Sequence, residues 1–359
     1  KDKKPDEPKK KEIDPKKIAE DANKLGKAMD AFIFTDKKAV AETLRGKTAE
    51  EIALIKEEYK KHFGRDLTAD ISKTVGSNDN DPLVKEVNVS LQGDPAKSYI
   101  ESLKRASKDG WFGGANKDQL KNILSGMDPE TAKRVRADYK GPNGESLDQM
   151  LGANLKGADL NMAKGYLDGN NAAVDSAKID QKMHSGLFGS GGFLGTGWGR
   201  DNKGIEQVLD QSKDKDALRK AYQTQTNLSL DKDVTKDLSG TQKNITEAVL
   251  KDDKSAADAG RVKQATEGWF TDKNAIYKAM EGKKPEEIAQ MKKVYDDVYG
   301  KQKGGVTQDE AGVVGALTLV GSPLAPIAAF DAMRKHRSDG MNCDTMLEKN
   351  LGGLDLEKA

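Results

Sequence analysis

Four stretches of the chain align without gaps over nineteen residues, and each begins at a tyrosine. They read YKKHFGRDLTADISKTVGS from Tyr59, YKGPNGESLDQMLGANLKG from Tyr139, YQTQTNLSLDKDVTKDLSG from Tyr222 and YDDVYGKQKGGVTQDEAGV from Tyr295. Each stretch follows a charged amphipathic run, such as TAEEIALIKEEY before the first. This self-similarity predicts four copies of one unit of about eighty residues.

The repeated unit is expected to be helical. Thr48-Ala-Glu-Glu51 has the pattern of a capping box, and Ile52, Ile55, Tyr59 and Phe63 then fall on one helical face. Alternating runs typical of strands are largely missing. Because a single copy cannot bury its apolar face alone, the copies are expected to pack on one another.

Composition excludes several classes of function. One third of the residues are charged, but the two signs cancel to +1, so no global basic field exists to gather nucleic acid. Cys343 is the only cysteine, which excludes an internal disulfide and a multi-cysteine metal site. The three histidines are far apart, and no nucleophile–base or paired-carboxylate motif indicates an enzyme.

The repeat resembles that of the annexins. The resemblance rests on YKKHFGRDL from Tyr59 and on the preceding AMDAFIFTDKKAVAETLRGKTAEEIALIKEEY, and it extends over residues 16–340. It implies an all-α fold of four five-helix repeats packed into a slightly curved disc. The expected divisions are a disordered linker (1–15), repeats at 16–92, 93–170, 171–251 and 252–340, and a C-terminal tail (341–359).

The resemblance also implies calcium sites in the loop after the first helix of each repeat. The family signature there is Gly-x-Gly-Thr, with an acid in a later helix. Calcium takes about six to eight oxygens, which loop carbonyls and one bidentate carboxylate supply in part. Water or lipid phosphate would complete the shell.

Two loops are expected to bind calcium. In repeat 3 the expected ligands are Gly195, Gly197, Gly199 and Asp237, with Arg200 where the family has Thr; in repeat 4 they are Thr266, Gly268, Phe270 and Glu310. Asn154 takes the acidic position of repeat 2, which makes a poorer ligand. Thr74 takes that position in repeat 1, where no site is expected.

All three tryptophans, Trp111, Trp198 and Trp269, occupy the middle of these loops, and Ile33 takes that place in repeat 1. Indole rings favour the headgroup region of a bilayer, so these four residues are expected to contact membrane. The alternative is that each ring folds back against its own repeat. The uncharged run 311–330 is read as a buried closing helix of repeat 4 rather than a membrane segment.

The predicted function is calcium-dependent peripheral binding to acidic phospholipid membranes, with no enzymatic activity and no nucleic-acid partner. The alternative is a calcium-independent annexin-fold scaffold or interaction module, with neighbouring domains of a longer chain as partners. The expected location is the cytoplasm or the periphery of a membrane. Secretion stays open, because a chain that opens on Lys1 can be a fragment.

Overall fold

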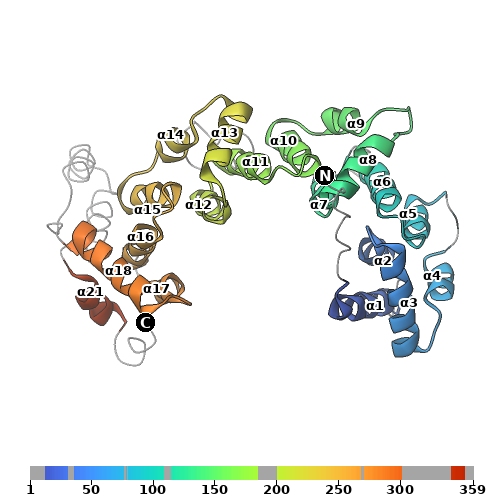
Figure 1. Cartoon of the computed structure of the whole chain (residues 1–359), viewed down its shortest axis with the longest axis horizontal. Helices are drawn as coiled ribbons and strands as arrows, with labels where there is room; N and C mark the ends of the chain where they lie inside the picture. The colour runs from blue at the N-terminus through green and yellow to red at the C-terminus, as the bar shows by residue number, and fades with distance from the viewer. Residues whose placement is uncertain are drawn as a thin grey trace, which may run out of the picture. The chain divides into compact units, whose positions relative to one another are not determined.

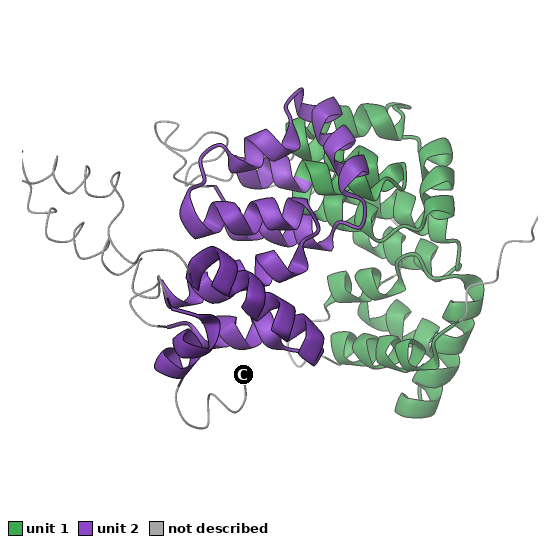
Figure 2. Cartoon of the chain, turned by 60° about the vertical axis from the view of Figure 1, so that its left-hand side comes forward, with its two compact units in different colours: residues 1–177 green, residues 178–359 purple. Residues whose placement is uncertain are grey.

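The computed structural model describes residues 13–30, 36–76, 78, 80–108, 115–184, 200–267, 271–300 and 341–351. Every regular element in these ranges is a helix, which confirms the predicted all-α class (Figure 1). None of these helices is long and apolar enough to cross a membrane, and the run 311–330 lies outside the described ranges. The chain divides into two compact units, residues 1–177 and 178–359 (Figure 2).

Unit 1 contains two rounds of five helices. The first round is α1 (Pro15–Met29), α2 (Lys37–Leu44), α3 (Ala49–Phe63), α4 (Leu67–Thr74) and α5 (Pro82–Ser90). The second is α6 (Pro95–Ala106), α7 (Lys117–Ser125), α8 (Pro129–Asp138), α9 (Leu147–Asn154) and α10 (Gly157–Leu167). The predicted capping box at the start of α3 is confirmed, since the Glu51 amide donates to Thr48 Oγ1 and the Glu51 carboxylate accepts from the Thr48 amide.

A third round begins at the boundary between the units with α11 (Asn171–Met183). It continues with α12 (Asn202–Gln211), α13 (Lys215–Thr226), α14 (Leu230–Thr235) and α15 (Gly240–Leu250). The described helices of the fourth round are α16 (Lys254–Thr266), α17 (Lys273–Met280), α18 (Pro285–Tyr295) with the π-helical turn η2 (Asp296–Gly300), and α21 (Cys343–Asn350).

Each round has its own apolar core, which is consistent with the four predicted repeats. The four tyrosines that define the sequence repeat lie in or just after the third helix of each round. They are almost fully buried, with side chains no more than 1% exposed at Tyr59, Tyr139, Tyr222 and Tyr295. Burying a large aromatic ring contributes strongly to a core, which explains why this position recurs.

The tight turn after α3 depends on a glycine. Gly64 ends the helix with φ +69°, in the left-handed region, and its amide donates to the Lys60 carbonyl. A side chain would meet no atom within 4 Å there, so the backbone conformation rather than space favours glycine. Asn227 ends α13 in the same way, with φ 60°.

The fourth core differs from its predicted extent. α21 lies in the segment expected to be a C-terminal tail, yet Cys343, Met346, Leu347 and Leu351 are buried in the fourth core. Residues 342–351 (NCDTMLEKNL) are identical to residues 146–155 (SLDQMLGANL) at five of ten positions. α21 therefore corresponds to α9, the fourth helix of the second round, and residues 301–340 lie between the third and fourth helices of the last round.

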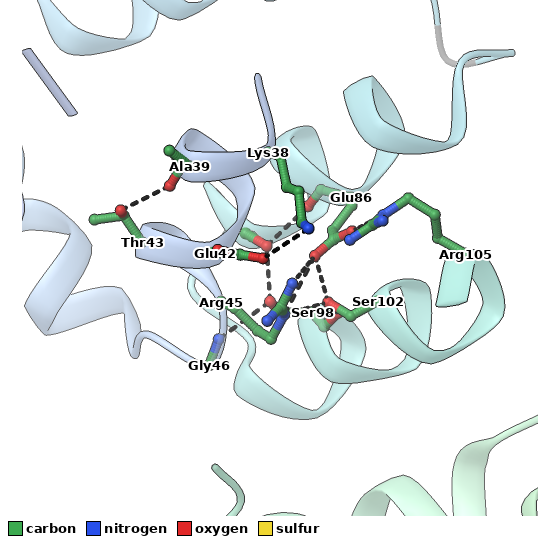
Figure 3. Close-up of polar contacts among 11 residues, drawn as sticks. Lys38, Ala39, Glu42, Thr43, Arg45, Gly46, Glu86, Ser98, Ser102 and Arg105 are labelled. Atoms are coloured by element: carbon green, nitrogen blue, oxygen red, sulfur yellow. Dashed lines mark hydrogen bonds and ion pairs between the residues drawn. The ribbon is translucent and has the colours of Figure 1, made fainter. Parts of the chain in front are cut away.

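The first and second rounds are joined by a buried ionic cluster (Figure 3). Glu86 on α5 is fully buried, and its carboxylate accepts hydrogen bonds from Arg45 Nη2 (2.9 Å), Arg105 Nε (2.6 Å) and Ser102 Oγ (2.5 Å). Arg45 follows α2, whereas Ser102 and Arg105 belong to α6. A carboxylate buried in this way is tolerated only when it is paired and hydrogen-bonded, so α2, α5 and α6 depend on one another.

In unit 2 the third and fourth rounds are joined by ion pairs of a different arrangement. Arg261 on α16 donates through Nε to Glu206 (2.7 Å) and through Nη2 to Asp210 (2.6 Å), both on α12. In both units an arginine on the first helix of the later round pairs with a carboxylate of the preceding round, which lies on the fifth helix in unit 1 and on the second helix in unit 2.

Candidate calcium and membrane site

The structure describes two of the twelve predicted site residues. Asp237 and Thr266 lie within the described ranges. The others lie outside them: Ile33, Trp111, Gly195, Gly197, Trp198, Gly199, Gly268, Trp269, Phe270 and Glu310. The described residues that flank the loops give the geometry around the predicted sites.

In the third round the acid lies close to the end of the loop. Asp237 is exposed, two residues beyond α14, and Arg200 is the first described residue after the glycine-rich segment 185–199. The Arg200 guanidinium donates to the Val234 carbonyl and, over 3.5 Å, to the Asp233 carbonyl. The end of the loop and the fourth helix are therefore in contact across 33 and 34 residues of sequence, as a shared ligand set requires.

The charge of Arg200 is affected by both burial and nearby carboxylates. Burial lowers the pKa of its guanidinium, while the carboxylates of Asp237 and Asp233 act in the opposite direction. Its Nε is buried and has no hydrogen-bond partner among the described residues. A positive charge therefore lies in the field of Asp237, where a calcium ion would also have to bind.

In the other three rounds, the described residue that corresponds to Asp237 is uncharged. Thr74 Oγ1 donates to the Asp70 carbonyl (2.7 Å), Asn154 Nδ2 to the Met150 carbonyl (2.8 Å) and Asn350 Nδ2 to the Met346 carbonyl (2.7 Å). Each of these bonds runs back four residues within its own helix. In addition, Asn350 Oδ1 accepts from Thr271 Oγ1 (2.7 Å), which lies just after the fourth loop.

The gap-free repeat predicts Glu310, which lies outside the described residues, at the acidic position of the fourth round. The correspondence of α21 with α9 gives a second candidate for that position, Asn350. The match between residues 146–155 and 342–351 was the available signal, but forty residues interrupt the repeat before it.

Thr266 offers no side-chain ligand. It is fully buried at the end of α16, and its Oγ1 donates to the Lys263 carbonyl at 2.7 Å. Its expected contribution was a backbone carbonyl, to which the side-chain hydrogen bond is no obstacle.

The first round also joins its loop to its fourth helix through an arginine. Arg65, in the turn between α3 and α4, contacts Asp30 through Nη2 (2.9 Å) and Asp70 through Nε (3.0 Å). Asp30 immediately precedes the first loop. A guanidinium thus bridges loop and helix in rounds one and three, from different positions in the sequence.

Among the described side chains, the chemistry suits calcium in the third round. Asp237 is an exposed carboxylate beside a loop rich in glycine, which is the hard oxygen chemistry that calcium prefers. Threonine and asparagine side chains bonded within their own helices do not replace a bidentate carboxylate. Among the described residues, no three His, Cys, Asp or Glu side chains form a metal-binding group.

Comparison with known proteins points to one family. Residues 20–80 match the family model Annexin. Annexin A4 of Sus scrofa is 24% identical over 294 residues, covering 79% of this chain and 87% of the relative. Annexin A13 of Mus musculus is 28% identical over 264 residues, covering 73% and 76%, and annexin A5 of Homo sapiens is 24% identical over 303 residues, covering 80% and 90%.

Solved structures similar to this chain include annexin III, at 17% identity over 91% of this chain and 95% of that protein, with a TM-score of 0.25. That score is too low to bear on the assignment, which rests on the sequence relatives and the repeated helices. These matches support a divergent, annexin-like protein.

Proposed function

We propose that this protein binds acidic phospholipid membranes as a peripheral protein, and that its response to calcium arises in the third repeat alone. Annexins generally bind such membranes with calcium. The observation that carries the proposal for this chain is the position of Arg200, the residue that follows the third loop, which lies against α14 and in the field of Asp237.

The ligands of the third repeat would be the carbonyls of Gly195, Gly197 and Gly199 together with the Asp237 carboxylate. A bound calcium ion would supply the positive charge that attracts a lipid phosphate. Asp237 would hold that ion, and its exposure leaves the neighbouring space accessible to a headgroup.

For the fourth repeat, the gap-free alignment gives the ligand set Thr266, Gly268, Phe270 and Glu310, whereas the correspondence of α21 with α9 gives Asn350 in place of Glu310. Asn350 occupies the position that Asp237 has in the third repeat, and its amide is bonded to Thr271 and Met346. An uncharged, engaged amide would bind calcium weakly at best.

Trp111, Trp198, Trp269 and Ile33 are proposed to enter the membrane interface from the loop centres. This contribution does not require calcium, because indole partitions to the headgroup region by itself. It places the protein at the periphery of a membrane. Annexins are generally not enzymes, and we propose no catalytic activity for this chain.

A second candidate function is a calcium-independent scaffold or interaction module. The specific observation in its favour is that Thr74, Asn154 and Asn350 replace the carboxylate in three of four repeats. In this case the protein would have the annexin fold but would not bind calcium.

Co-sedimentation with phosphatidylserine vesicles, in calcium and in chelator, tests the proposal. Calcium is expected to increase pelleting of the wild type, and Asp237→Asn to abolish that increase. Asp216→Asn is the matched control, because it removes a carboxylate that is 94% exposed on α13 of the same unit. If calcium has no effect on the wild type, the third repeat is not a calcium site and the scaffold candidate gains.

A further inference from the structure

A basic hollow of about 430 Å³ lies in unit 1 and is bordered by Lys108, the last described residue before residues 109–114. The start of α5, the second half of α6 and the turn after α8 form its walls. The charged side chains that line it are Lys85, Glu101, Lys104, Arg105, Lys108 and Lys140. Ligand sites in proteins commonly have volumes of this order.

Positive charge in this hollow exceeds the negative charge available to pair with it. Glu101 is shared by two lysines, at 3.2 Å from Lys85 Nζ and 3.0 Å from Lys104 Nζ. Lys108 and Lys140 are exposed, and neither has an ion pair with a carboxylate among the described residues. Among the described residues, the hollow therefore carries cations beyond those that its carboxylate can pair, and these can bind an anion.

One of the basic groups is held rigidly. Arg105 is only 7% exposed, and its Nε donates to Glu86 of the buried cluster shown in Figure 3. This bond fixes the inner wall of the hollow to the junction between the first and second repeats. Lys108 and Lys140, on flexible stems, lie further out and can follow a ligand.

We propose that this hollow binds the phosphate of an anionic phospholipid headgroup without calcium. The position of the hollow favours a lipid over a free anion, because Lys108 precedes Trp111, the expected membrane-contacting residue of the same loop, by three positions. The second repeat carries Asn154 where a calcium-binding carboxylate would be needed. Its own lysines supply the positive charge that the metal would otherwise bring. Basic pockets at membrane surfaces bind anionic headgroups in this way.

The inference rests on the proposed membrane function, but it is tested without calcium, whereas the calcium response is tested with it. Vesicle binding of the full chain is measured in chelator, on phosphatidylcholine vesicles with and without phosphatidylserine. The variant Lys108→Glu/Lys140→Glu reverses the two unpaired charges. The control Lys97→Glu/Lys133→Glu makes the same charge change on exposed residues of α6 and α8 that do not line the hollow.

The wild type is expected to bind the phosphatidylserine vesicles in chelator, and the hollow variant to bind at least about tenfold more weakly. The control variant is expected to stay within about twofold of the wild type. Circular dichroism and thermal unfolding of all variants show whether folding is retained, and Lys108→Gln/Lys140→Gln provides a milder pair if the reversals unfold the chain.

Three results would overturn the inference. One is an equal loss in the hollow and control variants, which would mean diffuse surface charge. Another is that the wild type does not bind vesicles in chelator. This result would not affect the proposed calcium response at Asp237, which is measured with calcium present. The third is calorimetric binding of inorganic phosphate with no vesicle binding, which would identify a site for a soluble anion.

Discussion

The Tyr222 hydroxyl donates a 2.6 Å hydrogen bond to Asp233 Oδ2 within the third repeat. The first repeat has the same bond, from Tyr59 to Asp70 at 2.7 Å, and an arginine lies beside each pair. In the second and fourth repeats, Met150 and Met346 take the place of the aspartate. Odd and even repeats thus combine the same buried tyrosine with different neighbours.

Tyr222→Phe is expected to lower the free energy of unfolding by about 1–3 kcal/mol, because it removes a bond to a charged acceptor and leaves Asp233 buried without it. Urea unfolding measures the change. Tyr139→Phe is the matched control, since its hydroxyl makes no such bond to an acid, and its loss is expected to be smaller. Equal losses in the two variants would contradict the role of the hydrogen bond.

Glu86→Ala should be among the most damaging substitutions in unit 1, at about 3–5 kcal/mol, because Arg45 and Arg105 lose their shared partner. Burial opposes ionisation of Glu86, but Arg45, together with hydrogen bonds from Arg105 and Ser102, outweighs it and lowers the pKa.

Since the folded-state pKa of Glu86 is below the usual value of 4.5, its contribution is present above that pH. It is lost as the pH falls through the folded-state pKa. Unfolding midpoints measured between neutral pH and this acidic range should therefore fall less steeply in Glu86→Gln than in the wild type. Parallel curves would show that another group governs the acid response.

Arg200→Thr is expected to reduce the calcium concentration for half-maximal vesicle binding roughly tenfold, because it removes a like charge from the field of Asp237. Titrating calcium in the co-sedimentation assay measures this. Arg65→Thr removes a guanidinium from the corresponding region of the first repeat, where Thr74 offers no carboxylate, and should leave the calcium titration unchanged. A weaker calcium response in Arg200→Thr would mean that Arg200 supports the site.

The two candidates for the fourth repeat can be separated directly. Asn350→Asp should add a calcium-responsive contribution, because it places a carboxylate where Asp237 lies in the third repeat, whereas Glu310→Ala should change nothing. Calorimetric calcium titration of both variants decides between them. A loss of calcium binding in Glu310→Ala would restore the gap-free alignment.

Cys343 is expected to resist alkylation in the folded protein at mildly alkaline pH. It is 1% exposed in the fourth core, and burial raises the pKa of its thiol to about 12, with Lys292 acting weakly in the other direction. Because the thiolate is the reactive form, iodoacetamide should label it only after denaturant opens the core. Rapid labelling of the native chain would show that α21 does not stay packed.

The sequence was sufficient for the helical class and for the repeat, because buried tyrosines and a capping box are local patterns. Thr48, Tyr59 and Tyr222 are found where periodicity placed them. The fourth helix of the last repeat could not be found by gap-free comparison, since residues 301–340 separate it from its partners. The contact of Arg200 with α14 could not be predicted from the sequence either. A hydrogen bond to a carbonyl more than thirty residues away leaves no local pattern.

The shared carboxylate of Glu86 has a consequence for how such a chain can be divided. A fragment ending after residue 92 would keep Arg45 and Glu86 but lose Ser102 and Arg105, and so expose an ionic surface that evolved to be covered. Arg261 imposes the same condition on a cut after residue 251. The sequence repeats every eighty residues or so, yet the smallest piece suited to independent expression or to gene duplication is a pair of repeats.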